Sequence, residues 1–277
     1  MHRPFPVTAL RFAIRSGPQY SNITEMKTIR KGNDIMNEQW KNKKVAFLGD
    51  SITAPSEAVA RNYWDYLAEE CGLVPLVYAF SGWSWAGVRT HAEKLLAEHG
   101  EDVDAIFIMM GTNDFNGGVP LGEWFDLSEE ETNIHGVVKK KIRRRFNTSG
   151  STLRGRINNG LGFLKAHFPK QQIILLTPIH RGYACFSETN VQPEESFPNE
   201  IERYAGEYVE CIKEAGNLWS VPVIDLNADS GLFPMLDGYA QYFHLADTDR
   251  LHPNTEGHRR IAEVIRYRIQ MYPATFR

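Results

Sequence analysis

Residues 45–53 read Val-Ala-Phe-Leu-Gly-Asp-Ser-Ile-Thr, and they indicate the class of fold more clearly than any other part of the sequence. Four consecutive apolar residues are typical of a β-strand that is buried on both faces. The glycine and aspartate that follow end the strand in a turn. Ser51 then stands directly after a buried strand and before a helical pattern, so its hydroxyl is expected at the carboxyl edge of a sheet. The residues themselves leave a second interpretation open, in which Ser51 only caps the next helix.

Outward from this stretch, short apolar runs alternate with helical patterns along the chain. The expected strands are Val45–Leu48, Pro75–Ala79, Ala105–Met110, Ile173–Thr177 and Val221–Ile224. The expected helices span 56–70, 87–99, 152–167, 200–218 and 254–270, the last with Asn254 as its N-cap. This alternation predicts an α/β fold with a parallel sheet of about five strands and helices on both faces. Ligands of such sheets bind at the carboxyl ends of the strands.

The composition excludes several classes of protein. The chain has 277 residues, of which 42% are hydrophobic and 23% charged, and a net charge of −3. These values are ordinary for a folded globular protein and argue against a dedicated nucleic-acid binder. Without an apolar run of 18 residues, we expect no stable membrane insertion. Three cysteines without metal-ligand spacing favour a reduced, cytoplasmic compartment.

The N-terminal stretch differs from the rest of the chain. Residues 1–36 contain six Lys and Arg against two acidic residues and show neither a helical nor a strand period. We therefore expect a flexible extension in front of a catalytic domain that spans residues 37–277. A transit peptide remains an alternative for this basic segment.

Polar side chains follow other predicted strands as well. Asn113 comes after the third strand, where its amide can point into the same cleft as Ser51 or merely form an Asx-turn. Gly82 comes after the second strand and permits close backbone approach, so that its N–H can help line an oxyanion site.

Asp249 and His252 lie shortly before the last predicted helix. A histidine there is placed as a general base, and an aspartate three residues earlier can hold its imidazole in one tautomer. A surface turn with a helix cap is the alternative. Each of these features alone is common by chance. The combination of Ser51, Asn113 and the Asp249–His252 pair in this order is much less common.

Together these blocks resemble the signature of the SGNH, or GDSL-type, hydrolase superfamily. The resemblance implies a flavodoxin-like three-layer α/β/α sandwich and an esterase or acylhydrolase that needs no cofactor or metal. It implies Ser51 as nucleophile, His252 as base and Asp249 as the residue that orients it. It also implies Gly82 and Asn113 as oxyanion donors.

Further residues at the same sheet edge are candidates for substrate binding. Trp83 and Phe115 offer flat aromatic faces that suit sugar rings or acyl chains, although core packing is the alternative for each. His180 and Arg181 follow the fourth strand and can pair with a substrate anion or form a surface salt bridge.

Two long segments, 115–150 and 178–199, interrupt the strand–helix alternation and are expected to form loops around the site. The first contains the basic run 139–145, which we interpret as a solvated helix face partnered by Glu129, Glu130 and Glu131. Contact with an anionic polymer or lipid surface is the alternative.

The sequence thus predicts a serine esterase for short-acyl, acetyl-type esters of a carbohydrate or another small polar alcohol. Aromatic residues interleaved with polar groups around the predicted site favour a hydroxylated substrate, either a small molecule or an oligosaccharide. A lysophospholipase or thioesterase of the same superfamily, and a non-catalytic flavodoxin-like binding module, remain alternatives. We expect no nucleic-acid partner, and a homo-oligomer stays open.

Overall fold

The computed structural model describes residues 38–276. The predicted flexible extension, residues 1–36, lies outside this range. Among the described residues, no helix is both long and apolar enough to cross a membrane.

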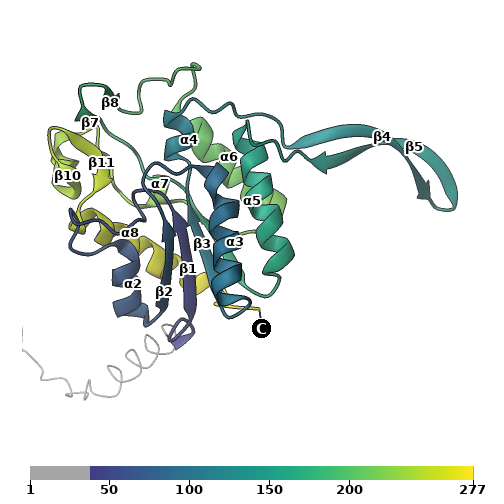
Figure 1. Ribbon diagram of the computed structural model, residues 1–277, viewed down its shortest axis with the longest axis horizontal. Helices are drawn as coiled ribbons and strands as arrows, with labels where there is room; N and C mark the ends of the chain where they lie inside the picture. Colours follow the sequence, from purple (N-terminus) through teal and green to yellow (C-terminus); the bar gives the residue numbers. More distant parts are fainter. Residues whose placement is uncertain (1–37, 277) are drawn as a thin grey trace, which may run out of the picture. The chain divides into compact units, whose positions relative to one another are not determined.

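A five-stranded parallel sheet forms the centre of the described chain (Figure 1). Its strand order is β2-β1-β3-β6-β9, and its members are β1 (Lys44–Gly49), β2 (Val74–Ala79), β3 (Ala105–Met109), β6 (Gln172–Leu176) and β9 (Val223–Ile224). All five strands expected from the sequence are present. The parallel α/β prediction is therefore confirmed, because every neighbouring pair in the sheet is parallel.

Successive residues of the central strands point to opposite faces, and each face has its own apolar core. Leu48 and Ile106 belong to the core beneath α3 (Val88–His99), α5 (Leu153–His167) and α6 (Ala205–Trp219). Phe47 and Phe107 belong to the core beneath α2 (Tyr63–Cys71) and α8 (Thr255–Arg268). The two cores make the three-layer sandwich visible in Figure 1.

Two of the predicted helices begin later than expected. Helix α2 begins after Asn62, whose backbone N–H donates to Asp65, so residues 56–62 form a loop and not a first helical turn. Helix α6 begins at Ala205, five residues after the predicted start. Helix α8 begins as predicted, because the side chain of Asn254 accepts hydrogen bonds from the N–H groups of Glu256 and Gly257.

The two segments expected as loops contain regular structure. Residues 115–150 complete the short helix α4 (Thr112–Asn116) and form an antiparallel ribbon of β4 (Phe125–Ile134) and β5 (Val137–Phe146). Residues 178–199 contain β7 (Ala184–Ser187) and β8 (Asn190–Gln192), which join β10 (Phe243–Leu245) and β11 (Asp249–Pro253) in a second sheet. Four shorter elements complete the described fold: the 3₁₀ turns η1 (Trp85–Gly87), η2 (Asp237–Tyr242) and η3 (Ile269–Met271), and helix α7 (Leu226–Asp229).

The prediction of a helix for the basic run was wrong. Residues 139–145 lie in β5, where three of the six cations stand directly opposite acidic residues of β4; Glu130, for example, faces Lys141. The paired residues of opposite charge lie on different strands and are separated by the turn of the ribbon. A pattern read over neighbouring residues therefore does not reveal their pairing. The predicted acidic partners are partly correct, because Glu130 pairs with Arg143 and Arg145 and Glu129 pairs with Lys140.

Candidate active site

Ser51 lies in a tight turn at the carboxyl end of β1. The turn is held by Asp50, whose carboxylate accepts a hydrogen bond from the backbone N–H of Ile52 at 3.0 Å and whose carbonyl accepts from Ala54 at 2.9 Å. Burial raises the pKa of Asp50 to about 7, against the lowering effect of the hydrogen bond from Ile52. Ser51 caps no helix, since the N-cap of α2 is Asn62, so its hydroxyl is free to face the cleft.

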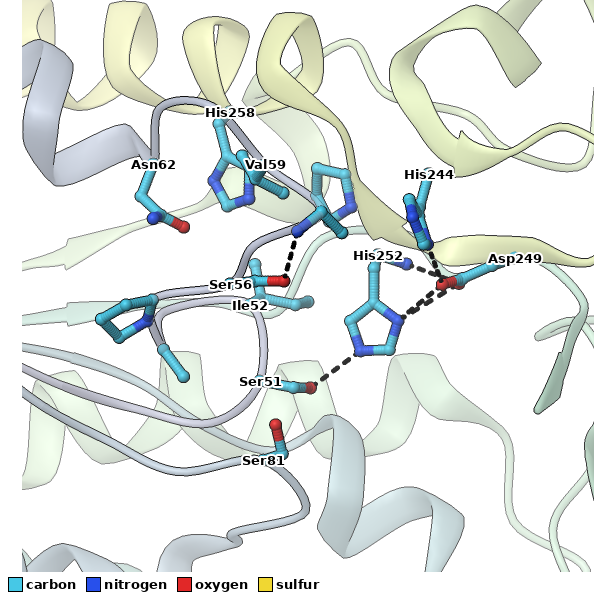
Figure 2. A pocket seen from close by; sticks show the side chains of 14 residues that line it. Ser51, Ile52, Ser56, Val59, Asn62, Ser81, His244, Asp249, His252 and His258 are labelled. Atoms are coloured by element: carbon cyan, nitrogen blue, oxygen red, sulfur yellow. Dashed lines mark hydrogen bonds and ion pairs between the residues drawn. The ribbon is translucent and has the colours of Figure 1, made fainter.

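The hydroxyl of Ser51 meets His252, which is 201 positions further along the chain. Ser51 Oγ lies 2.9 Å from His252 Nε2, and His252 Nδ1 lies 3.0 Å from Asp249 Oδ2 (Figure 2). The carboxylate of Asp249 also accepts hydrogen bonds from the backbone N–H groups of Leu251 and His252. His252 and Asp249 lie in strand β11, so an extended segment, and not the surface turn that the sequence left open as an alternative, sets the spacing of the pair.

Asp249 stays ionised in this arrangement. Burial alone would raise its pKa, but hydrogen bonds from His252 and His244 outweigh burial and hold the pKa below its usual value. An ionised carboxylate behind Nδ1 keeps the proton there and leaves Nε2 free to accept from Ser51.

Asn113 and Gly82 lie on the neighbouring turns of the same sheet edge. The Asn113 side chain donates from Nδ2 to the carbonyl of Trp83 at 2.8 Å, which ties the turn after β3 to the turn after β2. Gly82 has φ +77°, a left-handed conformation that favours glycine, and an added Cβ there would meet no atom within 4 Å. Backbone conformation, and not lack of space, therefore accounts for glycine at this position.

Asp114 fixes the helix turn that presents Asn113. It is fully buried and accepts hydrogen bonds from the backbone of Trp85 at 2.8 Å and from Arg156 at 2.9 Å. Gly111, directly before this helix, has φ +133°. A Cβ there would lie 2.9 Å from Ile212, so only glycine is accommodated without movement.

Comparison with known proteins identifies the family. The model of the GDSL-like lipase/acylhydrolase family matches residues 47–260, which include Ser51, Gly82, Asn113, Asp249 and His252. The chain belongs to the GDSL-like lipase/acylhydrolase family. This family assignment makes it a hydrolase and bears out the resemblance seen in the sequence. No curated protein matches the chain.

Solved structures share the fold of this GDSL-like hydrolase at low sequence identity. A protein of Lactobacillus plantarum is 23% identical with a TM-score of 0.65, and the match covers 84% of this chain and 98% of that one. A protein of Chitinophaga pinensis described as a possible lipase is 16% identical with a TM-score of 0.61, covering 82% and 98%. An acetylxylan esterase of Geobacillus stearothermophilus is 17% identical with a TM-score of 0.50, covering 84% and 96%. At these identities the likeness shows the fold.

A cavity of about 220 Å³ opens beside Ser51 in this GDSL-like hydrolase. Figure 2 shows the hydrogen-bonded chain of Ser51, His252 and Asp249 on one side of it and the 52–62 loop on the other. Its apolar wall consists of small or branched side chains, namely Ile52, Ala54, Pro55, Ala58, Val59 and Pro253. His258 of α8 also lines it, and burial lowers the pKa of this histidine to about 3, so that the ring is neutral at pH 7.

The four predicted substrate-binding residues lie outside the lining of this cavity, and a role in binding stays a prediction for each. Phe115 is buried and packs edge-on against Tyr208. Arg181 is buried, and its guanidinium donates hydrogen bonds to the carbonyl of Thr112 and the side chain of Gln192. His180 contacts Glu195, and Trp83 packs between Phe80 and His91.

His244 is a site residue whose role the sequence did not reveal. Its Nδ1 lies 3.2 Å from Asp249 Oδ2, the same carboxylate oxygen that His252 contacts, and its side chain lines the cavity. Strand β10 places it there through its antiparallel pairing with β11. Its position five residues before Asp249 carries no recognisable spacing, because the contact depends on the bulge between these strands.

No group of three or more His, Cys, Asp or Glu suited to a metal ion occurs within residues 38–276.

Proposed function

We propose that this GDSL-like hydrolase is a serine esterase in which Ser51, His252 and Asp249 form the catalytic triad. The observation that carries the proposal is the continuous hydrogen-bonded chain of 2.9 Å from Ser51 Oγ to His252 and 3.0 Å from His252 to Asp249. Serine is a weak nucleophile until an adjacent base accepts its proton, and this geometry supplies the base.

The reaction follows from these positions. His252 takes the proton of Ser51 as Oγ attacks the ester carbonyl, and it then protonates the leaving alcohol. The backbone N–H groups of Ser51 and Gly82 and the side-chain amide of Asn113 are proposed to hold the oxyanion. Each such donor contributes about 3–4 kcal/mol to stabilisation of the transition state. Water activated by His252 finally releases the acid and restores Ser51.

The proposed substrate is a short-acyl ester, with acetyl preferred, of a sugar or another polar alcohol. The cavity beside Ser51 measures about 220 Å³, below the roughly 300–1,000 Å³ of pockets for drug-sized ligands. Eight of its fourteen lining residues are polar or charged, whereas a long acyl chain gains about 0.8 kcal/mol for each buried CH₂ only along an apolar trough. The likeness to an acetylxylan esterase agrees with this choice but shows only the fold.

A series of nitrophenyl esters tests the substrate. We expect kcat/KM to be highest for acetyl and to fall through butyryl, octanoyl and palmitoyl. A maximum at octanoyl or longer would favour the lysophospholipase or thioesterase alternative. Acetylated oligosaccharides, assayed by release of acetate, extend the test to the alcohol.

Ser51→Ala tests the mechanism. We expect loss of at least about 10⁴-fold in kcat with an unchanged melting temperature, because removal of the nucleophile takes away the covalent route. Ser81→Ala is the matched control, since Ser81 lines the same cavity without a hydrogen bond to His252. A fluorophosphonate should label Ser51 and no other serine. Folded wild-type protein that hydrolyses no ester would support the binding-module alternative.

A further inference from the structure

The ribbon of β4 and β5, here called the arm, is firmly attached at its root. Phe146 stacks on Trp219 with ring centroids 4.2 Å apart, and Phe125 stacks on Phe146 at 5.1 Å. The side-chain amide of Asn158 donates to the carbonyls of Trp124 and Asn147, just outside the two strands. The arm therefore leaves the helices in a defined direction (Figure 1).

Beyond this root the arm exposes large apolar side chains. Leu127 is 67% exposed, Val138 63% and Ile142 62%. The strand register places these three on the face that carries Phe125 and Phe146, where they alternate with charged residues, namely Glu129, Glu131, Lys140 and Arg144. A two-stranded ribbon alone is marginally stable in water, and large exposed apolar side chains among charged ones suit a surface that a partner of opposite charge covers.

The charge of the arm is opposite to that of the rest of the chain. Residues 125–146 contain six Lys and Arg against four acidic residues, a net charge of +2. The other described residues contain 28 Asp and Glu against 18 Lys and Arg, a net charge of −10. A second copy of this chain therefore attracts the arm electrostatically.

One segment of the chain has both the negative charge and the exposed apolar side chains that complement the arm. Residues 182–202, here called the acidic loop, contain five glutamates and no Lys or Arg. They also expose apolar side chains, among them Phe186, Val191, Phe197 and Ile201. Within the described chain, Glu188, Glu200 and Glu202 make no ion pair with Lys or Arg. Figure 1 shows β7 and β8 of this loop on the opposite side of α4 from the arm.

Pairing of two arms with each other is disfavoured by charge. A twofold axis between two β5 edges would set six cations against six, and a twofold between two β4 edges would set acidic residues against each other. The arm therefore suits a binding surface other than a second arm, one with negative charge and exposed apolar groups. The acidic loop has both properties.

We propose that the arm of one copy docks on the acidic loop of a second copy, and that the second arm docks reciprocally on the first copy. Ten residues per strand span about 30 Å, which is enough to reach across a neighbouring domain. An arm-to-loop contact joins two different surfaces, and it closes as a dimer when a twofold axis forms both contacts at once. Phe186 of the acidic loop lies 5.5 Å from the ring of His252, so a docked arm lies beside the active site of its partner.

Sedimentation velocity of the full chain between about 1 and 100 µM tests the proposal. We expect a dimer whose dissociation constant rises with salt concentration. Leu127→Ser with Ile142→Ser on the arm, and separately Phe197→Ser with Ile201→Ser on the acidic loop, should each raise that constant at least tenfold. Tyr267→Ser with Met271→Ser is the control, since both residues are similarly exposed in a different region and should leave the dimer intact.

Hydrolysis of an acetyl ester and the melting temperature at low protein concentration verify that every variant is folded. A wild-type protein that stays monomeric at 100 µM overturns the proposal. A dimer that only one of the two variant pairs weakens overturns it as well, because the two surfaces must act together. A monomer that binds anionic vesicles or polyphosphate through the arm would identify an anionic partner in place of a second copy.

Discussion

Ile108 and Ile142 are both isoleucines in β-strands of one chain, but one is enclosed by protein and the other faces solvent. Ile108 lies in β3 of the central sheet and is fully buried, whereas Ile142 lies in β5 of the arm and is 62% exposed. The central strands are held by apolar burial on both faces, and their carboxyl ends carry the proposed active site. The arm is held by cross-strand pairing and a root of aromatic rings. Strands of the first kind determine the fold and chemistry, and strands of the second kind are available for contact with another molecule.

Two carboxylates offer the largest test of this contrast. Hydrogen bonds lower the pKa of Asp249 at the proposed site, and hydrogen bonds from Arg145 and Ser128 lower that of Glu130 in the arm to about 2. Asp249→Asn should reduce kcat by about 10⁴-fold, because an amide favours the wrong imidazole tautomer. Glu130→Gln should leave kcat unchanged when both are measured with an acetyl ester.

Asp247→Asn is the second control for the assignment. Asp247 lies two residues before Asp249, and it is Asp249 whose carboxylate hydrogen-bonds to His252. A severe loss with this variant and a mild one with Asp249→Asn would contradict the proposed triad.

The two isoleucines themselves give the next largest effect. Ile108→Ala should lower the free energy of unfolding by about 2–5 kcal/mol, since it removes buried methyl groups and leaves a cavity. Ile142→Ala should change it by less than about 0.5 kcal/mol when measured below the concentration at which copies associate. Urea unfolding followed by circular dichroism compares the two. Equal losses would show that the arm has a core of its own.

His244 tests how far the hydrogen-bonded chain extends beyond Asp249. His244→Ala removes one of the two imidazoles on Asp249 Oδ2, and we expect kcat to fall about tenfold, the effect of one hydrogen bond of about 1.4 kcal/mol to a charged group. KM should change little, and the acidic limb of the pH dependence of kcat should move to higher pH, because the hydrogen bond from His244 helps to hold the pKa of Asp249 down. An unchanged pH profile would indicate that His244 only lines the cavity.

The smallest effect concerns pH and a buried histidine of the central domain. Burial lowers the pKa of His91 to about 4, so between about pH 6.5 and 4 the unfolded chain binds a proton that the folded chain does not. The free energy of unfolding therefore falls as pH decreases through this window. His258 acts in the same sense, whereas Asp50, with its pKa raised to about 7, acts in the opposite sense.

Comparison with a variant isolates His91 from these other groups. The drop in melting temperature from pH 7 to pH 5 should be smaller in His91→Gln than in the wild type. His135→Gln, at the exposed turn of the arm, should leave the drop unchanged. If His91→Gln shows the full drop, the proton is taken up elsewhere.

Most of the central fold was predictable because its signals are local. Each buried strand is a short apolar run, and Asn254 marks the start of the last helix by its own side chain. The predicted start of helix 56–70 was wrong, because its first residues form the loop that lines the cavity. Tertiary contacts hold this loop, such as the hydrogen bond from the Ala60 N–H to the Thr255 hydroxyl.

Local sequence patterns were enough to predict the five parallel strands, the turn that presents Ser51 and the membership of a hydrolase family. These follow from apolar runs and from residue types that act within a few positions of one another. Only the tertiary structure decided that Ser51 meets His252 across 201 positions, that His244 shares Asp249, and that the basic run forms one edge of an exposed arm. The physical reason is that hydrogen bonds and strand pairing act through space, so partners far apart in the chain become evident only after apolar burial has assembled the sheet.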